Sequence, residues 1–288
     1  MKKLLFTTII TFVTSQAISQ TDSTKQTTDT IKAGNFVIIK KHGTKGQDGK
    51  EGKGGFNFSW RLGQKKEKSN ISTNWFILDI GFANYRDKTD YTFAQAGNYL
   101  RTINASVGDV AKESLKLRTG KSSNVNLWIF MQKINLSKHF INLKYGLGLE
   151  MYNFRFDRNI SYRKNPDPFI FNDTVNFSKN KLYAGYITIP LMLNFDFAPN
   201  NRKQLFTISA GVSAGYLINS RNKQISDIRG KIKYKGDFDL QPFRLAAVGE
   251  VGLGPIRLYG SYSLNALHDK GTRLEQYPYV IGVRFSNW

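Results

Sequence analysis

The sequence predicts an all-β fold, a membrane-spanning, antiparallel, up-and-down β-barrel of eight strands. Three observations lead to this fold class. The N-terminus has the pattern of an export signal, eight later segments alternate apolar with polar or small residues, and the connections between those segments alternate between long and short. The first observation places the chain outside the cytoplasm, and the other two describe a closed sheet with two unlike ends.

Residues 1–19 are typical of a secretory signal peptide. Lys2 and Lys3 form a short positive region, residues 4–13 are apolar, and residues 17–19 (Ala-Ile-Ser) fit a small-x-small cleavage site. The apolar run is shorter than the about 20 residues that a transmembrane helix needs. The mature chain is therefore expected to begin at residue 20.

Composition narrows the class of protein and partner. The chain of 288 residues has no Cys and a formal net charge of +21. The absence of Cys fits an exported protein that is held together by sheet closure rather than by disulfides. Such a basic chain would suggest nucleic acid if it were cytoplasmic. Export makes nucleic acid an unexpected partner and anionic lipid headgroups an expected one.

Residues 20–73 are expected to form a periplasmic, partly flexible segment. Glycine recurs every third residue from Gly43 to Gly55, but the tract is short and lacks Pro, which favours a flexible linker over a collagen helix. Residues 36–39 are candidates for one short strand, and residues 56–60, which alternate, are candidates for another outside the barrel. Whether an extra N-terminal strand joins the barrel stays open.

Residues 74–288 are expected to form the barrel. Eight segments alternate in polarity, and each can supply the roughly 9–11 residues that a tilted membrane strand needs. The predicted strands are 74–85, 122–135, 140–156, 182–197, 204–220, 242–253, 256–268 and 277–288.

The lengths of the connections alternate without exception. They are, in order, 86–121, 136–139, 157–181, 198–203, 221–241, 254–255 and 269–276. Membrane barrels have long outer loops and short periplasmic turns. With an even number of strands, both ends of the barrel lie in the periplasm and the first connection is an outer loop, as this order requires.

The strands present one apolar face and one polar face. In 140–156, Leu143 and Leu147 alternate with Lys144 and Glu150. A soluble barrel would bury the apolar face, whereas a membrane barrel turns it to lipid and the charges inward. The export signal, the alternating connections and the aromatic-rich last strand favour the outer membrane.

The inward phase then carries eight charges, four acidic and four basic. An eight-stranded barrel is just wide enough for side chains to fill it, so we expect a paired network, although charges facing trapped waters remain an alternative. The eight residues are Asp79, Lys144, Glu150, Asp196, Arg244, Glu250, Arg257 and Arg284.

Four stretches resemble the PorT-like group of outer-membrane β-barrel proteins. They are NWFILDIGFANY at 74–85, KYGLGLE at 144–150, YITIPLML at 186–193 and GPIRLYGSYSL at 254–264. The similarity runs from about residue 74 to the C-terminus. It implies an outer-membrane barrel and, through the namesake of the group, a link to protein secretion.

A search for chemistry finds no catalytic, metal or cofactor motif. His42 lies in the glycine-rich stretch, His139 in a predicted periplasmic turn, and His268 at the outer end of a predicted strand on its lipid side. Ser261 and Ser263 fall on the opposite face from His268, so a nucleophile and base are not paired there. Neither an enzyme nor a bound cofactor is expected.

The outer loop 221–241 is basic. Lys231, Lys233 and Lys235 alternate with Ile232 and Tyr234, which suggests a hairpin that continues beyond the membrane. These lysines are candidate contacts for anionic lipid, including lipopolysaccharide phosphates. A merely solvated basic loop is the alternative.

The function expected from the sequence is a non-catalytic structural or interaction role, with a packed charged interior and no open pore. The alternative is an accessory role in a protein-secretion or envelope-assembly system. A lipid-A-modifying enzyme and a narrow channel rank lower. Expected partners are outer-membrane lipids, the machinery that assembles barrels and, under the alternative, secretion proteins.

Overall fold

The computed structural model describes residues 28–33, 36–41, 69–197, 199, 206–253 and 256–286. The chain divides into two compact units, 1–67 and 68–288. In the first unit, β1 (Thr28–Ala33) and β2 (Phe36–Lys41) pair antiparallel. The predicted signal peptide, the glycine-rich stretch with His42, and the possible strand at 56–60 lie outside the described residues.

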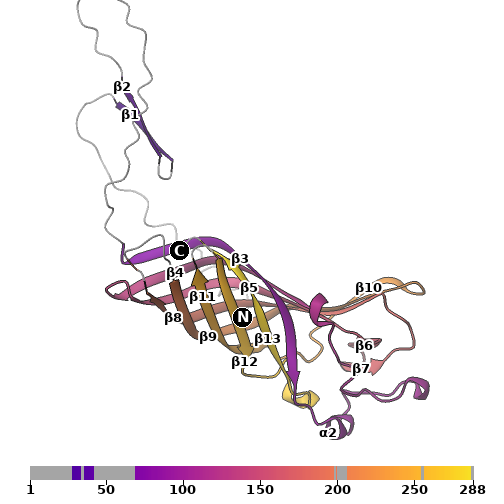
Figure 1. Ribbon diagram of the computed structural model, residues 1–288. Helices are drawn as coiled ribbons and strands as arrows, with labels where there is room; N and C mark the ends of the chain where they lie inside the picture. Colours follow the sequence, from indigo (N-terminus) through magenta and orange to yellow (C-terminus); the bar gives the residue numbers. More distant parts are fainter. Residues whose placement is uncertain are drawn as a thin grey trace, which may run out of the picture. The chain divides into compact units, whose positions relative to one another are not determined.

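A closed barrel of eight antiparallel strands forms the second unit, which confirms the predicted fold class (Figure 1). Each strand pairs with its neighbour in the chain, and the last pairs with the first. The strands are β3 (Ile71–Asp87), β4 (Ser123–Ser137), β5 (Ile141–Arg155), β8 (Lys179–Asp196), β9 (Phe206–Ser226), β11 (Phe243–Leu253), β12 (Ile256–Ser263) and β13 (Gln276–Phe285).

The apolar face of the strands is turned outward. On β3, the side chains of Ile80 and Phe82 are 50% and 64% exposed, whereas Asp79, the residue before Ile80, is 0% exposed. A soluble barrel would show the reverse arrangement, with the aliphatic side chains inside. The exposed apolar band and the buried charges are the arrangement of a barrel surrounded by lipid.

Aromatic residues contact one another near both rims of this band. Near the short turns, the rings of Trp75 and Phe130 lie 5.9 Å apart. At the opposite rim, the rings of Tyr216 and Phe243 lie 5.1 Å apart. Aromatic girdles at the two interfaces are typical of outer-membrane barrels.

The ladder between β5 and β8 is interrupted near Pro190, although β8 stays paired with β9 there. Proline has no N–H to donate to a neighbouring strand. Tyr145 of β5 pairs with Leu191 of β8, and the next pair is Gly148 with Thr188, so the residues between them are unpaired in this ladder. The Ile-Pro-Leu segment therefore lies at a break in an otherwise continuous ladder.

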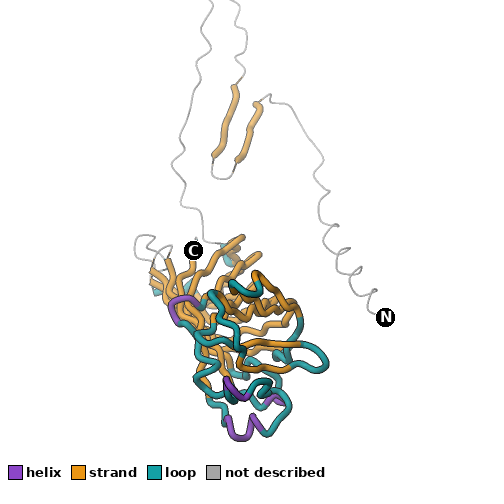
Figure 2. The backbone as a smooth tube through the Cα atoms, turned by 90° about the vertical axis from the view of Figure 1, so that its right-hand side faces the viewer, coloured by secondary structure: helices purple, strands orange, loops and turns teal. Residues whose placement is uncertain are grey.

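The long connections, expected as loops, contain secondary structure of their own. They hold α2 (Tyr91–Gln95), three short 3-10 turns, β6 (Ile160–Arg163), β7 (Phe169–Asn172) and β10 (Gly230–Lys235). Figure 1 shows α2, β6, β7 and β10 gathered at one end of the barrel, and Figure 2 shows loops and short helices around that end. Among the described residues, no helix is long and apolar enough to cross a bilayer.

Two local expectations are tested by these elements. β10 pairs with β9 from Gly230 opposite Ser226 to Lys235 opposite Arg221, so the hairpin does continue beyond the barrel as expected. β12 ends at Ser263, five residues before the predicted end of that strand. The prediction that His268 lies on the lipid side of a strand is therefore wrong.

Candidate functional site

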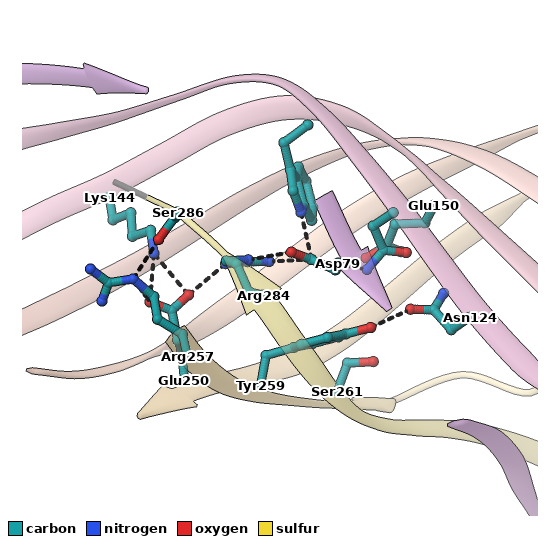
Figure 3. A network of polar contacts seen from close by, with 12 residues as sticks. Asp79, Asn124, Lys144, Glu150, Glu250, Arg257, Tyr259, Ser261, Arg284 and Ser286 are labelled. Carbon is teal, nitrogen blue, oxygen red and sulfur yellow. Dashed lines mark hydrogen bonds and ion pairs between the residues drawn. The ribbon is translucent and has the colours of Figure 1, made fainter. Parts of the chain in front are cut away.

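The structure places all eight of the charges predicted on the inward phase inside the barrel, where their residues are 0–6% exposed. They are buried because each lies on the inward phase of its strand, between residues that face outward. Figure 3 shows Asp79, Lys144, Glu250, Arg257 and Arg284 close together, with polar neighbours such as Ser286. The barrel interior is therefore the candidate site.

Glu250 on β11 is the centre of the network. Lys144 Nζ lies 2.8 Å from both carboxylate oxygens, and Arg284 Nη1 donates to Oε2 at 2.5 Å. Arg257 Nε lies 3.6 Å from Oε1. Three cations thus meet one carboxylate, and the excess positive charge requires a second acid nearby.

Asp79 on β3 supplies that second acid. Arg284 donates to it from Nε and Nη2, both at 2.7 Å, in a bidentate pair. Trp128 Nε1 donates to the same carboxylate at 2.6 Å and Asn126 Nδ2 at 3.2 Å. The pair joins β3 to β13, the first and last strands of the barrel.

Two ion pairs cross the lumen from β5 to β11. Lys144 pairs with Glu250 at 2.8 Å, and Glu150 pairs with Arg244 at 2.6 Å. β8 and β9 separate these strands on one side and four strands separate them on the other. On both β5 and β11 the basic residue precedes the acidic residue in the chain. Because the two strands run in opposite directions, a base on one strand faces an acid on the other in both pairs.

Asp196 contributes at the edge of the network. It lies at the end of β8, and its Oδ2 is 4.0 Å from Lys133 Nζ. Lys133 lies four residues before the end of β4. It was not among the predicted interior charges.

Neutral polar side chains that sequence reasoning missed complete the bonds of the arginines. Because a guanidinium has five N–H donors, one carboxylate cannot satisfy it. The strand periodicity that marked the charges also marks these neighbours, but nothing in one sequence says which polar residue will meet which charge. Arg244 Nε donates to Ser263 at 3.0 Å, Arg257 Nε to Ser286 at 2.6 Å and Arg257 Nη1 to Thr207 at 3.1 Å.

Little space remains among these side chains. A cavity of about 20 Å³ lies between Trp128, Glu150, Glu250, Tyr259 and Arg284, among other residues. That volume holds about one water molecule. At this level, side chains fill the barrel cross-section.

The four outer connections fold together over one mouth of the barrel. We call them the cap, which consists of residues 88–122, 156–178, 227–242 and 264–275. Backbone bridges join Leu100 to Ile170 and Leu240 to His268, and the Tyr99 hydroxyl donates to the Phe238 carbonyl. Each of these contacts links two different connections. The cap is therefore one folded unit rather than four separate loops.

The cap has an apolar core that continues into the barrel. Buried cap residues form one cluster with residues on the inner wall at the outer ends of β5 and β8. The cap contributes, among others, Tyr99, Leu115, Ile160, Tyr162, Ile170, Phe238 and Leu267, and the barrel wall contributes Tyr152, Phe154, Leu182 and Tyr186. The outer mouth is thus filled with apolar side chains.

A buried carboxylate fastens the β6–β7 hairpin to the β9–β10 turn. Asp173 accepts from Arg229 at 2.7 and 3.1 Å and from the Ser161 hydroxyl at 2.6 Å. Burial opposes the charge of Asp173, but the bonds from Arg229 and Ser161 outweigh burial and lower its pKa. The carboxylate therefore stays charged and holds the two hairpins together.

His268 lies in the cap core. Its ring stacks 6.2 Å from that of Tyr162 and meets Tyr99 edge-on at 5.8 Å. In the described part of the chain, neither ring nitrogen has a hydrogen-bond partner, and burial lowers the pKa of His268 to about 3. The chain turns inward after β12, which brings the residue into the core instead of to lipid.

The other candidates for chemistry are dispersed. Ser263 accepts a hydrogen bond from Arg244 inside the barrel. His139 lies in the turn after β4, where its backbone N–H donates to Asn135. Among the described residues, no group of three or more His, Asp or Glu is placed to hold a metal ion.

Of three comparisons with known proteins, the family comparison agrees with the barrel geometry. The family model described as "Outer membrane protein beta-barrel domain" matches residues 51–269. A search of curated proteins found no match. The crystal structure of Ail, the attachment invasion locus protein of Yersinia pestis, matches 73% of this chain and 97% of its own chain, at 13% identity and a TM-score of 0.30. Since the family match covers more than half of the 288 residues, the chain belongs to the outer membrane protein β-barrel domain family.

Proposed function

We propose that the protein is a non-catalytic outer-membrane barrel that is closed to ions and presents a folded cap for structural or interaction purposes. The observation that carries this proposal is the pair of salt bridges across the lumen, Lys144–Glu250 and Glu150–Arg244. They join strands on nearly opposite walls of the barrel, where a diffusion pore needs continuous water.

The narrow lumen and its outer mouth support the proposal. An interior of eight strands is wide enough only for side chains, and larger barrels are needed for an aqueous channel. Above the salt bridges, the apolar cluster of the cap continues the inner wall. An ion would have to displace both the charge network and this cluster.

The position of His268 supports a role without catalysis. A lipid-modifying enzyme needs a base that reaches its substrate. His268 is 2% exposed and its pKa is lowered by burial, so it is neither reachable nor easily protonated. The cap is better suited to contact other molecules through its surface.

The interaction role includes an accessory place in a secretion or envelope-assembly complex. The resemblance of the barrel strands to the PorT-like group is what favours it. Gentle detergent extraction of outer membranes followed by affinity capture of the full chain tests this. Stoichiometric recovery of envelope proteins would support the accessory role, and recovery of the chain with lipid alone would contradict it.

Conductance in planar bilayers tests the closed interior. The wild-type protein is expected to insert without steady conductance steps. The double variant Glu150→Ala/Arg244→Ala is the matched control, because it removes one crossing pair and keeps the other. It is expected to stay closed as well, since Lys144–Glu250 still spans the lumen. Large, stable steps from the wild type would contradict the proposal.

A further inference from the structure

Four neighbouring strands carry cations on their outward faces beyond the lipid-facing band. In one row, Arg155 of β5, Lys181 of β8, Lys223 of β9 and Lys233 of β10 are direct partners across the sheet. Adjacent rows add four more cations. We call the whole set the basic face, and it consists of Arg155, Lys179, Lys181, Arg221, Lys223, Lys231, Lys233 and Lys235.

The strand alternation fixes the direction of this face. The intervening residues Asn180, Leu182, Asn222 and Gln224 are 0–3% exposed and pack toward the interior and the cap. Successive side chains of a strand point to opposite faces. The basic residues therefore point outward, and Figure 1 shows β10 continuing past the barrel wall.

The basic face is continuous with the surface that contacts lipid. On β8, Ile187 and Ile189 share the phase of Lys181 and are exposed to lipid. On β5, Arg155 lies four residues beyond Met151, the last apolar residue of that phase. At about 3.3 Å per residue and a tilt near 40°, this is roughly 10 Å along the membrane normal. The long connections face outward, so this height is that of the outer-leaflet headgroups.

The cations repel one another within the protein. Like charges directly opposite in a sheet are destabilising. Lys181 lies beyond the lipid-facing part of β8, and burial together with Lys179, Lys223 and Arg221 lowers its pKa to about 8. None of the described residues in these paired rows is acidic. Asp157, two residues beyond Arg155 in the chain, is bound by Arg118 at 2.8 Å. Anions from outside the chain would relieve this repulsion.

We propose that the basic face binds the phosphate groups of phosphorylated glycolipids in the outer leaflet. Ammonium groups attract phosphate as point charges, and guanidinium groups can bind it with two hydrogen bonds. Arg221 is held in place over the Tyr183 ring at 4.4 Å. This proposal uses the outer-membrane location but does not depend on a closed interior, so its failure is distinguishable from that of the proposed function.

A matched pair of triple variants tests the proposal in the full-length protein. Lys181→Gln/Lys223→Gln/Lys233→Gln removes three charges from the central row. Lys88→Gln/Lys112→Gln/Lys270→Gln removes three charges from exposed positions of the outer connections away from that row. Folding of each protein is checked by its heat-dependent mobility in detergent gels. Binding is titrated with diphosphorylated lipid A, with dephosphorylated lipid A and with inorganic phosphate.

The wild type and the control triple are expected to bind diphosphorylated lipid A equally. Each cation near an anionic surface contributes about fivefold in affinity, so the central-row triple should bind about a hundredfold more weakly. Dephosphorylated lipid A should bind weakly to all three proteins. The triple Lys→Arg variant of the central row should retain binding.

Three outcomes would overturn the proposal. The central-row triple could bind as tightly as the control, which would show that these cations are not the site. Dephosphorylated lipid A could bind the wild type as well as the phosphorylated form. Inorganic phosphate could compete at the same phosphate concentration as lipid A, which would assign the face to soluble anions.

Discussion

At the scale of single residues, the interior depends on charges that have each been removed from water. Glu150 and Arg244 show this in a simple form, because they are 3% and 5% exposed and pair across the lumen at 2.6 Å. Desolvation makes a lone buried charge expensive, whereas a matched pair compensates itself. The stability of the barrel should therefore respond to the balance of charge more than to its amount.

A double-mutant cycle on this pair tests the point. Glu150→Gln or Arg244→Met alone should lower the free energy of unfolding by about 3–5 kcal/mol, because each leaves an uncompensated charge. The double variant should lose less than either single variant. Urea titration in detergent micelles, followed by tryptophan fluorescence, measures all four proteins.

A pair at the edge of the network supplies the control. Lys133 lies 4.0 Å from Asp196 and its side chain is 20% exposed. Lys133→Gln should therefore cost less than Glu150→Gln or Arg244→Met, because the pair is longer and partly open to water. Additive effects in the Glu150–Arg244 cycle, or an equal loss at Lys133, would mean that burial of these charges is not what matters.

His268 gives the cap a dependence on pH. Its pKa is about 3 in the folded protein because of burial, against about 6.5 in an unfolded chain. Between these values the unfolded state binds the extra proton, so stability is complete above pH 6.5 and falls as the pH drops toward 3. Its ring packs on Tyr99 and Tyr162, and Asp87 is the charged group that favours protonation.

His268→Phe keeps an aromatic ring in the stack and removes the titration. Limited proteolysis of the cap between pH 7.5 and 5 should become faster for the wild type as the pH falls and change less for the variant. Burial and Asp237 raise the pKa of Asp239, so protonation of Asp239 at low pH favours the folded state, opposite to His268. Both proteins contain Asp239, so its effect is the same in each. Identical pH profiles for the two proteins would rule out His268 as the sensitive group.

At the scale of elements, two facing glycines let a ring lie flat against the barrel wall. Gly282 of β13 pairs with Gly81 of β3 and with Tyr259 of β12. A Cβ at position 282 would lie 2.5 Å from the Gly81 Cα and 2.6 Å from the Tyr259 ring. The ring can thus reach across the glycines, and its hydroxyl donates to Asn124 at 2.7 Å.

Gly282→Ala should displace this ring. The expected loss of stability is about 1–3 kcal/mol, the usual cost of overpacking, and it should appear as a lower temperature for the gel-mobility shift. Gly260→Ala is the control, because a Cβ there meets only ordinary contacts, with the nearest atom at 3.5 Å. Equal midpoints for the two variants would contradict the packing argument.

The barrel strands and the β9–β10 hairpin were predictable from the sequence, and the rest of the cap was not. Alternation marks a strand whenever its two faces meet lipid and polar interior, and each of the eight predicted strands overlaps an observed one. The rest of the cap lacks such a period, because its short elements are held by contacts between distant segments, such as Tyr99 with Phe238. The end of β12 at Ser263 was missed for the same reason, since the turn inward depends on the cap.

The candidate site was predictable in content but not in pairing. Strand phase alone put Lys144 and Glu250 inside. That they meet across the lumen depends on the tilt and stagger of the closed barrel, which fix which inward residues share a level. The roles of Trp128 and Asn126 as donors to Asp79 depend on the same geometry.

At the scale of the whole molecule, the two ends of the barrel differ in kind. One end has short turns, and the other has the cap and the basic face. Ile228, at the tip of the β9–β10 hairpin, is 82% exposed, and Lys138 lies in the exposed turn between β4 and β5. Long connections face the outside of the cell in barrels of this class.

Single cysteines test this orientation, because the native chain has none. On intact cells, an impermeant thiol reagent should label Ile228→Cys and leave Lys138→Cys unlabelled. Permeabilised cells are the control, in which both positions should react. Labelling of position 138 but not of position 228 on intact cells would reverse the orientation and place the basic face in the periplasm.

The Asp79–Arg284 pair bears on the order in which the barrel is assembled. Its two residues are 205 positions apart in the chain and sit on the first and last strands, whereas Lys144 and Glu250 are 106 apart. Contacts between distant segments form late, because the intervening chain must be ordered first. Until β13 docks on β3, Asp79 lacks its guanidinium partner, so an unfinished barrel carries an uncompensated carboxylate at its open seam. The strand that closes the barrel also brings the counter-charge, which makes complete insertion the lowest-energy end of the assembly pathway.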